Sequence, residues 1–172
     1  MMFINADIIL PNNFLDIIKI VSDKFNKYLM VGHRWDLDLD QLIDFQNENS
    51  QTAFWKTVDK NSTKHRCTGI DYFVFNKTLW SILPEFIIGR PGYDNWLIWK
   101  ARRMLVPVID ASEVVKVIHQ NHDFNFHNLS SDPKLIPESE GLKNKELHQG
   151  KVLNILDANY FIHNKIIEKK TN

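Results

Sequence analysis

The sequence has little of several features that would place it in a familiar class of protein. Its single cysteine, Cys67, excludes an internal disulfide and is typical of a reducing compartment. Lys plus Arg and Asp plus Glu number 21 each, so no charge excess favours nucleic acid or an anionic membrane as a partner. No apolar run is long enough to cross a bilayer, and no secretory signal opens the chain. These observations predict a soluble, cytoplasmic protein without a transmembrane segment.

Common catalytic motifs are also missing. The sequence contains no glycine-rich phosphate loop and no Gly-x-Gly-x-x-Gly pattern. Cys67 stands beside His65 and Arg66, which favour a thiolate, but no further residue organises a catalytic triad around it. A structural zinc site is disfavoured because Cys67 has no second cysteine to share the metal. Carboxylates, amides and histidines are therefore the candidates for chemistry.

The chain is rich in apolar and aromatic residues, with 44% hydrophobic residues, 11 Phe and 5 Trp among 172. This composition predicts one packed domain, residues 1–164, followed by a charged tail, 165–172, that we expect to fray. Apolar spacing predicts strands near 1–4, 8–10, 28–31, 70–75, 106–109 and 114–118, and helices over 14–25, 95–104 and 138–148. Residues 33–38 are interpreted as a polar loop, residues near 42–45 as a helix, and 47–68 as a loop with one helical turn. Strands that alternate with helices predict an α/β fold.

The nine residues from Gly89 to Leu97 connect an apolar run to a predicted helix. Asp94 falls at the start of that helix, where it is either a reactive acid or an ordinary acid that interacts with the helix dipole. Arg90 either pairs with Asp94, binds a phosphate or braces the turn. Trp96 has the core as its default place, although an aromatic ring that lines a cleft also binds the face of a sugar.

Two further segments carry polar side chains next to apolar strands. Asn5 and Asp7 are spaced so that their side chains lean the same way, and their oxygens suit Mg²⁺ or Mn²⁺. His119 and His122 follow an apolar strand and are either metal or substrate ligands or ordinary loop residues. Asp71 is the single acid of the 70–75 strand and is either part of a buried network or a ligand for a substrate hydroxyl.

Taken together, these segments resemble a known family. The matching stretches are Phe3–Ile8, Gly69–Phe75, Gly89–Leu97 and Ile118–Asp123, in this order along the chain. They resemble the nucleotide-diphospho-sugar transferases with the GT-A fold, especially the glycosyltransferase family 2-like proteins. The similarity extends from about Phe3 to Phe126. Its specific parts are Gly89–Leu97, which we call the central turn, and the histidine segment, Ile118–Asp123. The resemblance implies a GT-A-like mixed sheet flanked by helices.

The resemblance also implies roles for individual residues. A divalent cation, Mn²⁺ or Mg²⁺, would be held by Asp7 and His122, with His119 as an alternative match. Asp94 would deprotonate the acceptor hydroxyl, as in inverting members of the family. The substrate-binding residues would be Asn5, Asp71, Arg90, Gly92, Asn95, Trp96 and His119. The reaction would transfer a sugar from a nucleotide-diphospho-sugar to an acceptor hydroxyl.

The chain departs from the family at its start. Enzymes of this fold have a nucleotide-binding half before the metal-binding segment, whereas only two residues precede Phe3 here. We therefore expect the metal-binding and acceptor-binding half of a transferase, completed by a second copy of the chain or by a partner chain. Two alternatives stay open: a non-catalytic remnant or binding module of the same fold, and a metal-dependent hydrolase or nucleotidyltransferase that uses the same carboxylates and histidines.

Overall fold

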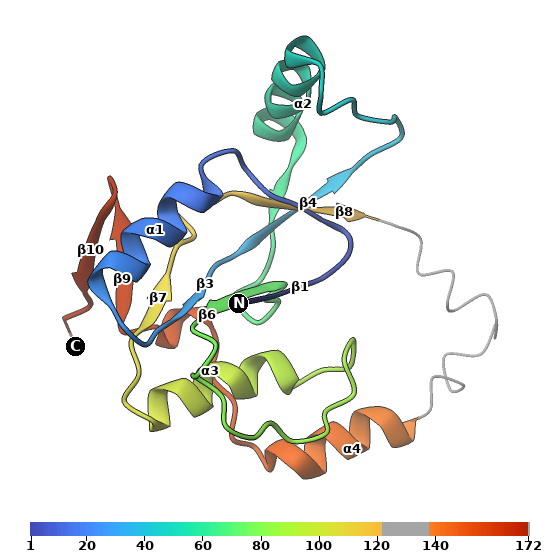
Figure 1. The fold of residues 1–172 in the computed structure, drawn as a ribbon. Coiled ribbons are helices and arrows are strands. Elements are labelled where there is room, and N and C mark those ends of the chain that lie inside the picture. Colours follow the sequence, from blue (N-terminus) through green and yellow to red (C-terminus); the bar gives the residue numbers. More distant parts are fainter. Residues whose placement is uncertain (122–137, 172) are drawn as a thin grey trace.

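The computed structural model describes residues 1–121 and 138–171, which adopt a mixed α/β fold (Figure 1). Two sheets combine with helices α1 (Phe14–Lys24), α2 (Glu48–Asn61), α3 (Tyr93–Arg103) and α4 (Glu138–His148). The α/β class predicted from the sequence is therefore confirmed. Within the described ranges, no helix has both the length and the apolar character needed to cross a membrane.

The larger sheet has six strands in the order β1-β6-β3-β7-β9-β10. Their bounds are β1 Met2–Ile4, β6 Tyr72–Phe75, β3 Leu29–Val31, β7 Val108–Asp110, β9 Tyr160–His163 and β10 Ile166–Lys169. Strands β3, β7 and β9 pair in parallel, and the other neighbours pair antiparallel. The sheet is mixed because β6 on one side and β10 on the other run against β3, β7 and β9, whereas β1, which is antiparallel to β6, runs in the same direction as these three strands.

Helices cover both faces of the larger sheet. Alternate side chains of each strand point to opposite faces, so neighbouring residues of one strand pack against different helices. Leu29 and Val31 of β3 belong to the same buried cluster as Leu97 of α3. Met30, which lies between them in the strand, belongs instead to the cluster that contains Ile17 of α1. The core therefore consists of two layers, one under α1 and one under α3.

The smaller sheet has the order β2-β8-β4-β5 and is covered by α2. Its strands are β2 Ile8–Ile9, β8 Val117–Asn121, β4 Arg34–Asp38 and β5 Thr63–Lys64. The chain passes from the larger to the smaller sheet after β1, β3 and β7, and it returns after β2, β5 and β8. At the β3–β4 passage a Cβ atom on Gly32 would lie 2.2 Å from the hydroxyl oxygen of Tyr72, so only glycine fits without displacing Tyr72.

Two predictions for the segment 33–68 are wrong. Residues 34–38, interpreted as a polar loop, form strand β4, because Trp35 and Leu37 alternate with polar residues and pack with α2. Residues 48–61, interpreted mostly as a loop, form the α2 helix, whose first turn is capped by the Asn47 side chain. The helical pattern is weak in the sequence because only Phe54 and Val58 of this helix are buried.

Two further predictions also fail. The helix expected near 42–45 is absent from the structure, which has a turn there in which the backbone N–H of Gln46 donates to the Asp44 side chain. The charged tail expected to fray instead supplies strand β10, which pairs antiparallel with β9. The hairpin turn uses Asn164 and Lys165, both with positive φ, and Ile167 of β10 is buried in the core.

Candidate functional site

Seven polar side chains meet where the strands pass between the two sheets. We call this group the junction cluster, and it consists of Asn5, Asp7, Arg34, Asp36, His65, Asp71 and His119. These residues come from segments that lie far apart in the sequence, and the passages of the chain between the sheets bring them to one place. Four of them, Asn5, Asp7, Asp71 and His119, are residues that the sequence marked as candidates.

Asp71 is the buried centre of the junction cluster, with an exposed fraction of 5%. The Asn5 side-chain amide donates a hydrogen bond to Oδ1 of Asp71 over 2.6 Å. Nη1 of Arg34 lies 2.7 Å from Oδ2 of Asp71 and donates to it. The backbone N–H of Asn5 also donates to the backbone carbonyl of Asp71, which extends the β1–β6 pairing. Asp71 is thus a member of a buried network, and each carboxylate oxygen retains capacity to accept one more hydrogen bond.

Asp36 and His119 continue the cluster toward Asp7. Nε of Arg34 lies 2.9 Å from Oδ1 of Asp36, an ion pair whose angle falls outside hydrogen-bond geometry, and Nδ1 of His65 lies 2.6 Å from Oδ2. The His119 ring stands between two carboxylates, with Nδ1 3.4 Å from Asp36 and Nε2 3.3 Å from Asp7. Carboxylates therefore outnumber guanidinium groups in the cluster, which favours the binding of cations and of protonated groups.

Asp94 and Tyr93 lie beside the junction cluster at the start of α3. Burial raises the pKa of the Asp94 carboxyl; the backbone N–H groups at the start of the helix oppose this rise, and the charge of Asp71 adds to it. Oδ1 of Asp94 is buried and has no hydrogen-bond partner among the described residues. Burial, together with the charges of Asp94 and Asp71, raises the pKa of Tyr93 to about 12, so its hydroxyl is protonated at neutral pH. At Asp94 the effect of burial on the pKa therefore exceeds that of the helix end.

The turn before α3 is fixed by helix α4 rather than by its own side chains. Gly92 is the residue before the helix, and its φ of 101° belongs to the left-handed region that glycine favours. Asn144 of α4, which is fully buried, accepts from the backbone N–H of Ile87 and donates to the carbonyls of Ile87, Arg90 and Pro91. The Arg90 side chain pairs with Glu140 of α4 at 2.8 Å, which corresponds to the bracing role among the three considered for it.

Two other residues of the turn segment pack inside the protein. The side-chain amide of Asn95 donates to the carbonyl of Leu153 over 3.0 Å, so it ties α3 to the segment that follows α4. Trp96 is buried in the core, where its ring packs at 5.3 Å from Phe86 and at 6.2 Å from Trp99, measured between ring centroids. In the structure both residues make structural contacts, and Trp96 occupies the core position that was its default expectation.

The proposed metal ligands are covered only in part. His122 lies outside the described residues, whereas Asp7 and His119 lie together in the junction cluster. Among residues 1–121 and 138–171, no group of three or more His, Cys, Asp or Glu side chains is arranged to hold a metal ion. One carboxylate and one imidazole do suit Mn²⁺. Mn²⁺, like Mg²⁺, commonly completes its coordination with water and substrate phosphate. The donor set present therefore fits a site with two protein ligands.

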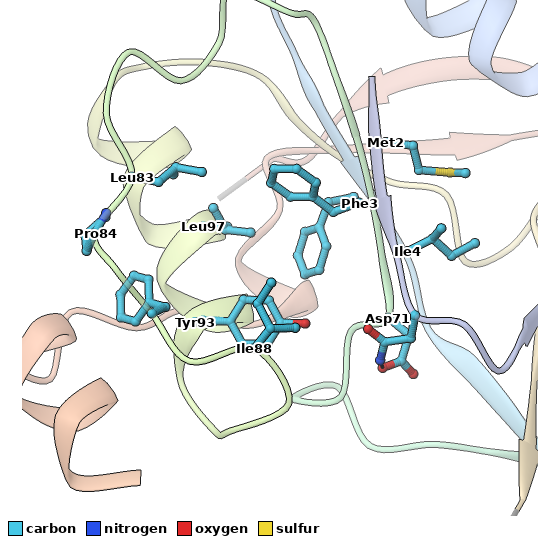
Figure 2. Close-up of a pocket in the computed structure, with 12 residues that line it drawn as sticks. Met2, Phe3, Ile4, Asp71, Leu83, Pro84, Ile88, Tyr93 and Leu97 are labelled. Atoms are coloured by element: carbon cyan, nitrogen blue, oxygen red, sulfur yellow. Dashed lines mark hydrogen bonds between the residues drawn. The ribbon is translucent and has the colours of Figure 1, made fainter. Parts of the chain in front are cut away.

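A cavity of about 370 Å³ lies next to the junction cluster, between the β1 end of the larger sheet and α3 (Figure 2). Figure 2 shows Phe3 pointing from β1 toward Leu97 of α3, while Met2 and Ile4 point to the other side of the strand. Asp71 lies at one end of the cavity, and the hydroxyl of Tyr93 is directed toward it. Asp94 itself does not line the cavity.

Three residues that hold the junction cluster together were not among those predicted from the sequence: Arg34, Asp36 and His65. Arg34 and Asp36 alternate with Trp35 and Leu37, so a period of two residues marks them as neighbours on one face of a strand. That signal was present and was overlooked because the segment is short and polar. His65 has no comparable signal, since only the fold brings it to Asp36.

In comparisons with known proteins, no protein-family model, no curated protein and no solved structure matched the chain.

Proposed function

We propose that the protein is a glycosyltransferase that transfers a sugar from a nucleotide-diphospho-sugar to an acceptor hydroxyl with the help of a divalent metal ion. The observation that carries the proposal is the environment of Asp94. This acid is buried, has one oxygen without a hydrogen-bond partner among the described residues, and interacts with Asp71 of the junction cluster. The resemblance of four sequence segments to family 2-like transferases supports the same reaction, because Asn5, Asp7, Asp71 and His119 from three of these segments meet in the junction cluster.

In this proposal Asp94 is the general base. A base is most effective when its pKa lies close to the working pH, and burial moves the Asp94 pKa upward from its ordinary value in that direction. Asp71 accepts a hydrogen bond from the acceptor hydroxyl and holds it near Asp94, while Asn5 and Arg34 fix the orientation of Asp71. The carboxylate of Asp94 takes the hydroxyl proton as the acceptor oxygen attacks the sugar carbon that carries the diphosphate.

Asp7 and His119 would hold the metal ion, together with His122 from outside the described residues. When bound, Mn²⁺ or Mg²⁺ supplies positive charge that stabilises a leaving diphosphate. The excess of carboxylates in the junction cluster supports this assignment, since it favours cations.

The proposal also includes a partner for donor binding and a cytoplasmic location. Strand β1 stands at the end of the larger sheet in the order of the described strands, and its residues Met2, Phe3 and Ile4 are exposed. An apolar strand at the end of a sheet is a surface on which another strand adds readily. A second copy of the chain, or a different chain, that pairs there would cover this edge of the larger sheet.

The experiment is a transfer assay with Mn²⁺ and a panel of nucleotide sugars, performed with the protein alone and with the product of any gene immediately upstream. We expect a glycosylated acceptor, and we expect Asp94→Asn to lower its rate of formation about 10²- to 10⁴-fold. Asp16→Asn is the matched control, because Asp16 is the first-turn acid of α1 and is exposed.

Each alternative to the proposal has its own outcome in this assay. Release of inorganic phosphate or pyrophosphate without a glycosylated acceptor would identify a hydrolase or a nucleotidyltransferase. No binding, hydrolysis or transfer in any combination would leave the non-catalytic binding module. An equal rate for Asp94→Asn and Asp16→Asn would remove Asp94 as the base.

A further inference from the structure

The cavity beside Asp71 is chemically asymmetric. Its walls are mostly apolar and include four aromatic rings, those of Phe3, Phe73, Phe86 and Tyr93. The remaining apolar surface comes from Met2, Ile4, Leu83, Pro84, Ile88 and Leu97. Of the side chains that line the cavity, Asn5 and Asp71 are the ones that carry a charge or an amide, and they lie next to each other at one end. A ligand that matches this arrangement has an apolar body and one polar end.

The cavity has the size and the access of a ligand site. Its volume of about 370 Å³ falls in the range of small-molecule pockets, which are lined mostly by apolar side chains with a few polar groups. Ile88 stands at its rim with an exposed fraction of 76%, so the cavity is reached directly from solvent. Aromatic walls favour a flat ring, because ring pairs gain from edge-to-face contacts in addition to the burial of apolar surface.

The charge at the polar end decides which head group fits. Asp71 lies there, and Asp94 is close enough to interact with it. An anionic head would be repelled by these carboxylates, whereas a hydroxyl can donate to Asp71 and accept from the Tyr93 hydroxyl. The polar end therefore selects an uncharged alcohol over a carboxylate or a phosphate.

We propose that this cavity binds the aromatic ring of the acceptor, so that the acceptor is an aryl-bearing alcohol whose hydroxyl donates to Asp71. The identification of this ligand as the acceptor rests on the proposed glycosyl transfer. The binding of an aryl-bearing alcohol in the cavity does not depend on that proposal. The ring lies between Phe3 and the loop that carries Leu83 and Phe86, and the hydroxyl lies at the end of the cavity formed by Asp71 and Tyr93.

The test measures the binding of three probes by calorimetry and by NMR of the methyl groups of Leu83, Ile88 and Leu97. The probes are 3-phenylpropan-1-ol, 3-phenylpropanoate with the same ring but an anionic head, and propane-1,3-diol without a ring. We expect the phenyl alcohol to bind saturably and to shift these methyl signals. The carboxylate should bind at least about tenfold more weakly, because its charge is repelled by Asp71. This factor corresponds to about 1.4 kcal/mol of binding free energy. The diol should not bind.

Two matched variants locate the binding site. Ile88 and Ile82 are both exposed isoleucines, at 76% and 82%, but only Ile88 is among the residues that line the cavity. Ile88→Asp should weaken binding of the phenyl alcohol about tenfold or more, since it removes apolar contact and adds negative charge at the rim. Ile82→Asp should leave it unchanged, and because both positions are exposed, neither change should affect folding.

The outcomes separate this inference from the proposed function. Binding of the phenyl alcohol without transfer to any acceptor leaves the cavity assignment standing and removes the glycosyltransferase. Transfer to plain sugars, with no binding of the phenyl alcohol and no competition from it, overturns the inference and retains the function. Equal binding of the alcohol and the carboxylate, or an equal effect of the two variants, also overturns it. The same holds if a second copy fills the cavity, which light scattering would detect as a dimer that Ile88→Asp dissociates.

Discussion

At the scale of single residues, the burial that raises the Asp94 pKa suits its proposed role as a base but lowers the stability of the folded protein at neutral pH. Burial raises the Asp94 pKa from the ordinary value of 3.8 in the folded chain. The folded protein thus binds this proton more readily than the unfolded chain does. The stabilising contribution is present below pH 3.8 and is lost as the pH rises through the higher folded value. At neutral pH the ionised side chain therefore costs stability.

We predict that Asp94→Asn raises the free energy of unfolding at pH 7, because the amide carries no charge that must be buried. The gain over the unmodified protein should shrink as the pH falls toward 4, where Asp94 is increasingly protonated. Urea denaturation at pH 7 and at successively lower pH values measures the difference. A variant that is less stable at pH 7, or a gain that is independent of pH, would contradict the burial of an ionisable Asp94.

Arg34 provides a second prediction at this scale. Its guanidinium group contacts both Asp71 and Asp36, and its side chain is mostly buried. Arg34→Met leaves these carboxylates without their cation and should lower the free energy of unfolding by about 3 kcal/mol, as expected when one partner of a buried ion pair is removed. The double variant Arg34→Met/Asp71→Asn should recover part of the loss, because the uncompensated charge is gone.

Denaturation with urea at pH 7 measures this coupling, and Arg103→Met, at an exposed position in α3, serves as the control. If the two single changes simply add in the double variant, Arg34 and Asp71 do not depend on each other in the way the contacts indicate.

At the scale of elements, helix α4 acts mainly as a support for the turn that begins α3. Its Asn144 side chain accepts from the backbone N–H of Ile87 and shares its two amide hydrogens among the carbonyls of Ile87, Arg90 and Pro91. These backbone groups are partly buried, and such groups are costly when they have no partner. The position of Asp94 therefore depends on a helix that is remote in the sequence.

We predict that Asn144→Ala lowers the free energy of unfolding by about 1–3 kcal/mol, since it removes the partner of partly buried backbone groups. It should also speed amide hydrogen exchange at Ile87, whose N–H donates to Asn144. Lys145→Ala, at an exposed position on the same helix, is the control for helix propensity. Unchanged exchange at Ile87 in Asn144→Ala would show that the turn is held by other contacts.

The elements also show how far sequence reasoning reaches. Helix α1 was predicted because Phe14, Ile17 and Val21 recur at helical spacing, and the structure buries these three residues. Helix α2 was missed because its buried side comprises only Phe54 and Val58, too few to produce a clear period. Strand β10 was missed because three of its four residues are exposed, so its pattern resembles a charged tail.

The candidate site was predictable where side chains were marked by their own local pattern. Asn5, Asp7 and His119 each follow or precede an apolar strand, and the structure brings them into one cluster with Asp71. Arg90 and Asn144 show the opposite case. Their contacts join α4 to the central turn, and no local pattern in either segment indicates that pairing.

At the scale of the whole molecule, the strands of the two sheets alternate along the chain, so we expect the two sheets to unfold together. Three passages carry the chain from the larger to the smaller sheet, and the junction cluster lies between them. We predict a single cooperative transition, in which Val58→Ala in the smaller sheet's core and Ile17→Ala in the larger sheet's core each shift the whole curve. Each should cost about 1–4 kcal/mol, as expected for truncation of a buried aliphatic side chain.

Tryptophan fluorescence and circular dichroism test this prediction, because Trp35 and Trp55 pack with the smaller sheet's cluster and Trp96 and Trp99 with that under α3. We compare two single-tryptophan variants, one that retains a tryptophan of the smaller sheet's cluster and one that retains a tryptophan of the cluster under α3. Their unfolding transitions should coincide. Separate midpoints for the two reporters would show that the sheets are independent units.

The close approach at Gly32 has a consequence for genetics. An added methyl group there would meet the Tyr72 hydroxyl and the backbone of Ser112, at a point where the chain leaves one sheet for the other. Gly32→Ala therefore offers a conditional allele, whose product folds at low temperature and unfolds on warming while every polar side chain of the junction cluster is kept. Such an allele separates the loss of the protein from the loss of its chemistry inside a living cell.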